Sequence, residues 1–102
     1  MNKLSSSSEL LNAIENWFSA QCDDDWEHSW GLRIETIDNP GWRVEIDLVE
    51  TAWAKVEIAF SRTERSESDW IHFKVHDGKF DGAGGVGNLA ELLCCFLAVV
   101  QA

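Results

Sequence analysis

The sequence of 102 residues has few basic side chains, with eight lysines and arginines against eighteen aspartates and glutamates and a formal net charge of −10. This charge would repel both the phosphate backbone of a nucleic acid and the surface of an anionic membrane. The deficit therefore argues against direct binding to either and favours a basic protein partner. Acidity that only keeps a protein soluble is the alternative interpretation.

A long hydrophobic run is also lacking. The apolar stretch at 89–100 is too short and too interrupted to span a bilayer, and the N-terminus lacks the apolar segment of a signal peptide. The three cysteines are an odd number, and the adjacent Cys94 and Cys95 are expected to be buried, reduced thiols. We therefore expect a cytoplasmic protein that forms one domain over residues 1–102.

Helical patterns occupy both ends of the chain. Ser6 and Glu9 have the spacing of a capping box, and the apolar residues that follow predict a helix over about 7–20. Asn88 is a candidate N-cap for a final helix. The expected buried stripe of that helix consists of Leu89, Leu93, Phe96, Leu97 and Val100.

Between these helices, alternating apolar and polar residues predict strands over about 30–37, 42–48, 54–60 and 70–76, with a short one at 79–80. Turns are predicted at 38–41 and 77–78, a polar connection at 61–68 and a glycine hinge at 82–87. This order indicates an α+β fold, a mostly antiparallel four- to five-stranded meander sheet with the N-terminal and C-terminal helices packed on one face. The other face should be polar, with Trp70 as an exposed exception.

The segment 17–28 combines two tryptophans, a phenylalanine, four carboxylates and a histidine. Large aromatic rings beside charges are typical of a protein-recognition surface, although packing in the core is the simpler explanation for any single tryptophan. Candidate partner-binding residues come from this segment and from the polar sheet face. They are Asp23, Asp24, Asp25, Trp26, Glu27, His28, Trp30, Glu45, Asp47, Trp70 and His72.

Catalytic patterns are weak. Cys22, Asp25 and His28 could belong to a small metal- or thiol-dependent enzyme, but their spacing matches no calcium loop or zinc motif, and neighbouring acids would raise the pKa of the thiol. The glycines at 82–87 lack the lysine and the serine or threonine of a phosphate-binding loop. We therefore predict no catalytic residue, no metal and no cofactor.

Several segments together resemble the immunity protein 53 family. They include Trp17-Phe18, Gln21-Cys22-Asp23, residues 25–28, residues 36–42 and Asp69-Trp70-Ile71, and they follow one another along nearly the whole chain. In the family pattern, glycine stands where this chain has Asp24 and tyrosine where it has Trp30. The resemblance implies a small antitoxin of a bacterial polymorphic-toxin or contact-dependent inhibition system, which binds and neutralises a cognate toxin.

The charge adds a hypothesis about that toxin. Carboxylates can imitate the phosphates held by a basic nuclease, while indole rings fill apolar hollows around its cleft. The expected partner is therefore a basic, nuclease-type toxin domain. When free, the protein is expected to be a monomer or a weak homodimer.

Overall fold

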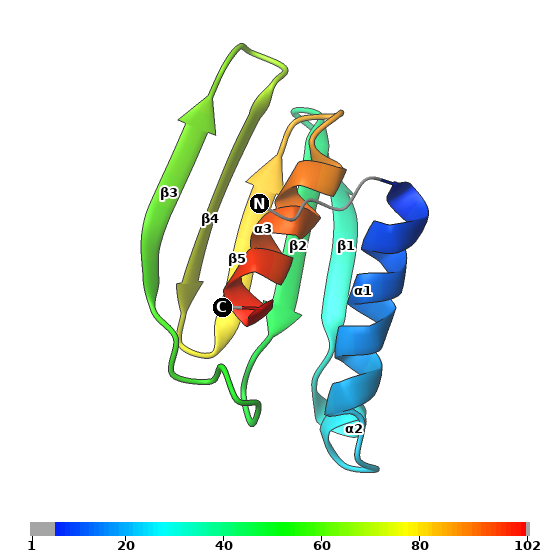
Figure 1. The fold of residues 1–102 in the computed structure, drawn as a ribbon. Helices are drawn as coiled ribbons and strands as arrows, with labels where there is room; N and C mark the ends of the chain where they lie inside the picture. Colours follow the sequence, from blue (N-terminus) through cyan, green and yellow to red (C-terminus); the bar gives the residue numbers. More distant parts are fainter. Residues whose placement is uncertain (1–5, 102) are drawn as a thin grey trace.

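The computed structural model describes residues 6–101, which form three helices and five strands (Figure 1). The helices are α1 (Ser7–Gln21), α2 (Trp26–Ser29) and α3 (Leu89–Gln101). The strands are β1 (Leu32–Ile37), β2 (Gly41–Asp47), β3 (Ile58–Glu64), β4 (Trp70–His76) and β5 (Lys79–Gly84).

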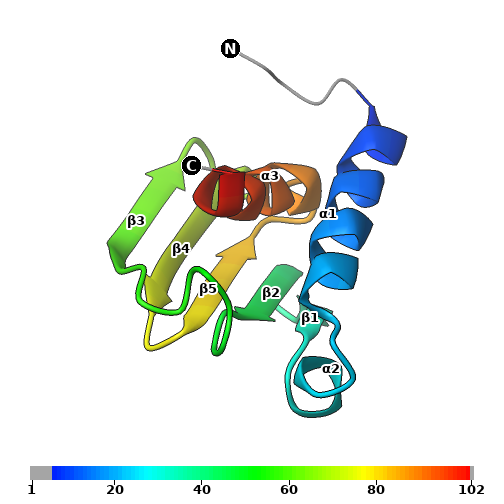
Figure 2. The same ribbon diagram turned by 60° about the horizontal axis from the view of Figure 1, so that its bottom comes forward.

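The five strands form one sheet in the order β1-β2-β5-β4-β3, and every neighbouring pair is antiparallel. Both long helices lie on one face: α3 crosses the middle strands and contacts α1, which lies beside it near β1 (Figures 1 and 2). The α+β class and the two helices on one face are confirmed. The strand order departs from a simple meander, because residues 48–57 carry the chain from β2 to the far edge, and β5 returns to pair with β2.

The first helix begins where the capping pattern predicts. The Ser6 side chain accepts a hydrogen bond from the backbone N–H of Glu9 at 3.1 Å, which satisfies one of the free donors of the first turn. Leu10, Ile14 and Trp17 recur at helical spacing and are buried. The helix continues to Gln21, one residue beyond the expected end.

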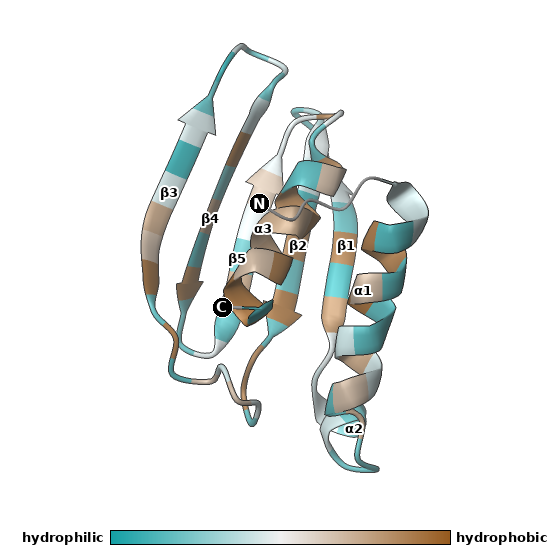
Figure 3. Cartoon of the chain, in the orientation of Figure 1, coloured by the Kyte–Doolittle hydropathy of each residue, from teal (hydrophilic) through white to brown (hydrophobic). Residues whose placement is uncertain are grey.

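The core lies between the helices and the inner face of β2, β4 and β5. Val44, Phe80 and Phe96 are fully buried there, and the apolar side of α3 covers this region (Figure 3). The cysteines of α3 are half-buried rather than fully buried. In β2, the buried Val44 and Ile46 alternate with polar residues on the other face, which is the pattern that predicted this strand.

The predicted glycine hinge is wrong for its first half, because β5 continues to Gly84 at the centre of the sheet. A Cβ atom at Gly82 would lie 2.8 Å from Cδ1 of Leu92, and one at Gly84 would lie 3.2 Å from Cβ of Asn88. Glycine therefore lets α3 approach the sheet closely. The sequence Gly82-Ala83-Gly84 has no alternation of apolar and polar side chains, so sequence reasoning could not recognise this part of β5 as a strand.

The third strand is displaced from its predicted range of 54–60, and 61–64 belong to it rather than to a polar connection. An irregularity in the register between Ile58 and Ser61 turns Phe60 to the open face, where 57% of it is exposed. This strand is an edge that the helices leave uncovered, so most of its residues are exposed. Because residues 61–64 are all polar, their sequence did not indicate that the strand continues to Glu64.

Candidate binding site

The α1–α2 loop, residues 22–25, is held together by its own carboxylates. The two carboxylate oxygens of Glu27 accept hydrogen bonds from the backbone N–H groups of Asp23 and Asp24, both at 2.9 Å. One carboxylate oxygen of Asp23 accepts from the N–H groups of Asp25 and Trp26, at 3.0 and 2.9 Å. These bonds satisfy backbone donors at the start of α2, so two of the four carboxylates in this segment have a structural role.

The remaining two carboxylates face solvent. Within residues 6–101, the side chains of Asp24 and Asp25 make no hydrogen bond or ion pair, and both residues are exposed. Asp24 has a φ of 71°, in the left-handed region that glycine adopts most readily. This backbone geometry is compatible with the glycine that the resemblance described above implies at this position.

Trp26 was predicted to be a contact anchor, and the structure corrects this. Only 3% of Trp26 is exposed, and its ring lies 6.0 Å from that of Trp17 in an edge-to-face arrangement. Its indole N–H donates to the carbonyl oxygen of Val49 at 2.8 Å. Although four carboxylates surround it in the sequence, this buried, hydrogen-bonded indole is a core residue.

Other candidates also have structural partners. Trp30 is half-buried against the core. Glu45 forms ion pairs with Arg33 and Arg43, and the cross-strand hydrogen bond from Arg33 lowers its pKa. The carboxylate of Asp47 accepts a hydrogen bond from the N–H of Gly31 at 3.0 Å. His28 is exposed on α2, next to the acidic loop.

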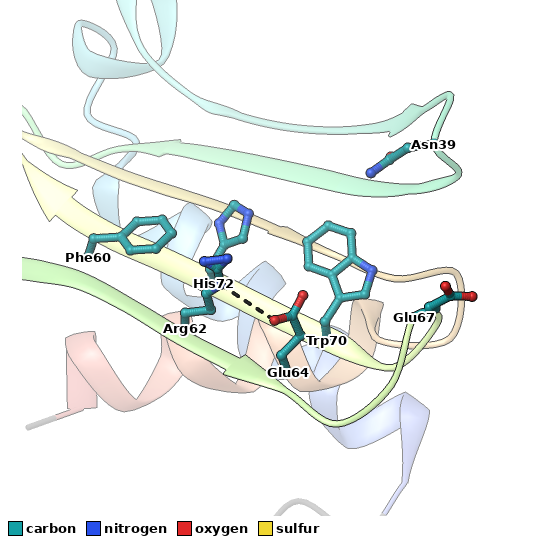
Figure 4. A pocket seen from close by; sticks show the side chains of 7 residues that line it. All are labelled: Asn39, Phe60, Arg62, Glu64, Glu67, Trp70 and His72. Atoms are coloured by element: carbon teal, nitrogen blue, oxygen red, sulfur yellow. Dashed lines mark ion pairs between the residues drawn. The ribbon is translucent and has the colours of Figure 1, made fainter.

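Trp70 and His72 lie elsewhere, on the open face of β4, where they line a hollow of about 420 Å³ (Figure 4). We call this site the aromatic hollow, and its lining residues are Asn39, Phe60, Arg62, Glu64, Glu67, Trp70 and His72. Asn39 belongs to the turn after β1, whereas Phe60 belongs to the strand at the opposite edge of the sheet. The hollow therefore extends over the open face from the turn after β1 to the edge strand β3.

A row of three rings lies along this hollow. The His72 ring lies 4.9 Å from that of Phe60 and is stacked on that of Trp70 at 5.3 Å, with an angle of 27° between the latter two planes. Partial burial, assisted by the nearby charge of Arg62, lowers the pKa of His72 below its ordinary value of 6.5, against a weaker opposing effect of Asp81. The imidazole is therefore neutral at pH 7, and the row presents uncharged ring faces.

Charged side chains stand around the rings. Glu64 lies 3.8 Å from Nε of Arg62, and both side chains are more than half exposed, so this pair is weak. Within the described residues, Glu67 makes no hydrogen bond or ion pair. Sequence reasoning missed Phe60, Glu64 and Glu67. The spacing of Phe60, Arg62 and Glu64 could have placed these three on one face of a strand, but it does not indicate which face, and Glu67 lies outside the strand.

The surroundings of Cys22 give no support to the alternative of a thiol- or metal-dependent enzyme. The Cys22 thiol donates to the carbonyl oxygen of Phe18 at 3.3 Å, and desolvation together with the charges of Glu27 and Asp23 raises its pKa. This environment disfavours the thiolate. Over residues 6–101, no group of three or more histidine, cysteine, aspartate or glutamate side chains is arranged to hold a metal ion.

A sheet that is covered by helices on one side and presents half-exposed aromatic rings and charges on the other has the features of a protein-recognition surface. A comparison with models of known protein families identifies the family. The model of the immunity protein 53 family matches residues 11–101, and the chain belongs to that family. Neither a curated protein nor a solved structure matches the chain. None of the described helices is long and apolar enough to cross a membrane.

Proposed function

We propose that this protein is an antitoxin that neutralises a cognate bacterial toxin by binding it in a one-to-one complex. Membership of the immunity protein 53 family carries this proposal, because the matched region includes nearly every described element. The open sheet face supports a mode of action by binding, since it offers aromatic rings and charges that the helices leave uncovered.

We further propose that the toxin is a basic, nuclease-type domain. The net charge of −10 would accelerate its approach, and the solvent-facing carboxylates of Asp24 and Asp25 could occupy sites that hold phosphates in the free toxin. Asp23, Glu27 and His28 would complete a charged rim, with Trp30 behind it. The proposed setting is the bacterial cytoplasm, where the free protein is a monomer or a weak homodimer.

Co-expression with candidate toxins tests the proposal. The tagged protein is used to capture partners from its own host, and each captured protein, together with the product of the neighbouring gene, is expressed with and without the antitoxin. We expect one basic partner whose toxicity disappears only when the antitoxin is present. If no toxic partner is neutralised, the antitoxin function is wrong.

The charge component has a separate test. An electrostatically assisted complex should associate more slowly and bind more weakly as salt increases, because ions screen charges that lie more than a few ångströms apart at molar concentration. A complex with unchanged affinity in 1 M salt would contradict the basic toxin and leave neutralisation by binding intact.

A further inference from the structure

We propose that the aromatic hollow is the docking site for an arginine side chain of the toxin, so that the guanidinium stacks on Trp70 and pairs with Glu64 and Glu67. This inference rests on the proposed function and names the contact that carries it. It also assigns the main contact to the open sheet face instead of the acidic α1–α2 loop.

The ring row supplies the first part of the recognition. Trp70 and His72 are both half-buried and stacked, so their orientation is fixed before a partner arrives. A planar guanidinium is attracted to the face of an indole and stacks on it, whereas a compact ammonium group has no plane to stack. Burial holds the pKa of His72 below its ordinary value, so the middle ring carries no positive charge of its own at pH 7, and the nearby Arg62 is partly offset by Glu64.

The carboxylates supply the second part. Glu67 makes no hydrogen bond or ion pair within residues 6–101, and Glu64 has only its 3.8 Å contact with Arg62. By contrast, Glu45 on the same sheet face is held by two arginines. The hollow therefore contains two carboxylates that remain available to a new cation, and guanidinium can bind a carboxylate through two parallel hydrogen bonds.

Charge over the wider face explains why the hollow, and not the whole face, selects the partner. Five basic and five acidic residues alternate across the open side of the strands. Eight of them lie opposite a residue of the other charge on a neighbouring strand, and Arg62 and Glu64 are neighbours on β3. The basic and acidic residues are Arg33, Arg43, Arg62, Lys74 and Lys79, together with Glu35, Glu45, Asp47, Glu64 and Asp81. Their charges cancel, so a basic partner gains from this face chiefly where Glu67 adds an uncompensated carboxylate beside the rings.

The contact can be tested without the toxin, with acetyl-arginine amide as the probe and acetyl-citrulline amide as its uncharged analogue of the same shape. The indole N–H signal of Trp70, identified from its absence in W70F, is followed by NMR in the full-length protein. We expect arginine amide to shift this signal in a saturable manner and citrulline amide to have little effect. The variant E64Q/E67Q should bind arginine amide roughly fivefold more weakly.

The matched control is E15Q/E50Q, which removes the same charge from two exposed residues outside the hollow and should bind as the unchanged protein does. Equal shifts with both probes, no shift of Trp70, or shifts confined to 23–27 would each overturn the proposal.

A second measurement uses a toxin that the unchanged antitoxin neutralises. E64Q/E67Q should bind this toxin about tenfold more weakly than E15Q/E50Q does. Equal affinities would remove the hollow from the interface while the antitoxin function stands. Failure of the unchanged protein to neutralise any toxin would instead remove the proposed function itself.

Discussion

The α1–α2 loop and the aromatic hollow contain the same kinds of side chain and use them in opposite ways. In the loop, Glu27 and Asp23 turn their carboxylates toward backbone N–H groups, and Trp26 enters the core. In the hollow, Trp70 is half-buried and lines the open face, and Glu67 makes no hydrogen bond or ion pair within the described residues. A dense cluster in sequence is thus largely satisfied internally, whereas a dispersed set of residues remains available.

This difference reflects how each region is assembled. Neighbours in sequence can satisfy one another through a short turn, because each carboxylate lies within reach of several free N–H groups at a helix start. Residues that meet from separate strands and turns are positioned by the sheet, and polar groups that stay exposed to water need no partner within the protein. Free polar groups beside rigid rings are therefore a better indication of a binding surface than density of charge.

The strongest test of the comparison is to replace one tryptophan in each region, Trp26 and Trp70, and to compare the losses in the free energy of unfolding. Replacing the buried Trp26 by alanine should lower the free energy of unfolding by about 3–5 kcal/mol, through lost burial and a cavity. W70A should cost about 1 kcal/mol, since it removes mainly the stacking on His72. Urea unfolding followed by circular dichroism measures both values.

A conservative variant keeps this test informative if W26A does not fold. W26F retains a ring but loses the hydrogen bond to the carbonyl oxygen of Val49. It should remain less stable than W70F. Equal losses for the two positions would show that the loop and the hollow do not differ in the way the structure indicates.

Much of the fold follows from sequence patterns, and the exceptions have physical reasons. The capping residue Ser6 and the alternation in β2 predict their elements correctly, since each depends on neighbours in sequence. The position of β5 between β2 and β4 does not follow, because alternation identifies a strand and not its partner.

The candidate site shows the same limit. Trp70 and His72 were predicted from the polar side of a strand, and the structure places both in the hollow. Phe60 could not be placed with them, since the register irregularity that turns it outward has no signal in the sequence. The indole of Trp26, surrounded by acids in the sequence, could not be assigned to the core without the path of α2.

The second prediction compares the carboxylate of Asp23, which holds the loop, with those of Glu64 and Glu67 in the aromatic hollow. D23A should lower the free energy of unfolding by about 1 kcal/mol, because its side chain satisfies two N–H groups at the start of α2. E64Q/E67Q should leave stability within about 0.5 kcal/mol, as expected for exposed positions without a structural bond. Thermal unfolding of both variants checks this, and a larger loss for the hollow variant would contradict it.

Acidification should loosen the α1–α2 loop. Hydrogen bonds from the backbone N–H of Glu27 itself and from those of Asp23 and Asp24 hold the pKa of Glu27 below its ordinary value of 4.5, despite some desolvation. A lowered pKa in the folded state means that Glu27 stabilises the fold above pH 4.5, and that this contribution is lost as the pH falls through the folded pKa. The amide signals of 23–27 should therefore move before the protein unfolds.

The control for this titration is E27Q, which cannot accept both hydrogen bonds at any pH. Its loop signals should already resemble those of the acidified protein at neutral pH, and its stability should decline less on acidification. Identical acid profiles for E27Q and the unchanged protein would show that the carboxylate of Glu27 does not hold the loop.

The smallest expected effect concerns Asp24, the loop residue whose backbone has a φ of 71°. Glycine adopts this conformation without the steric cost of a Cβ atom, but it also gains freedom in the unfolded chain, and the two effects oppose each other. D24G should therefore change the melting temperature by no more than about 2 °C, whereas D24V should lower it more, since a β-branched residue is poorly suited to positive φ.

If the loop serves only as a charged rim and the hollow carries the contact, D24G should also bind the toxin almost as well as the unchanged protein does. A large loss of affinity in D24G with stability preserved would move the main contact back to the loop.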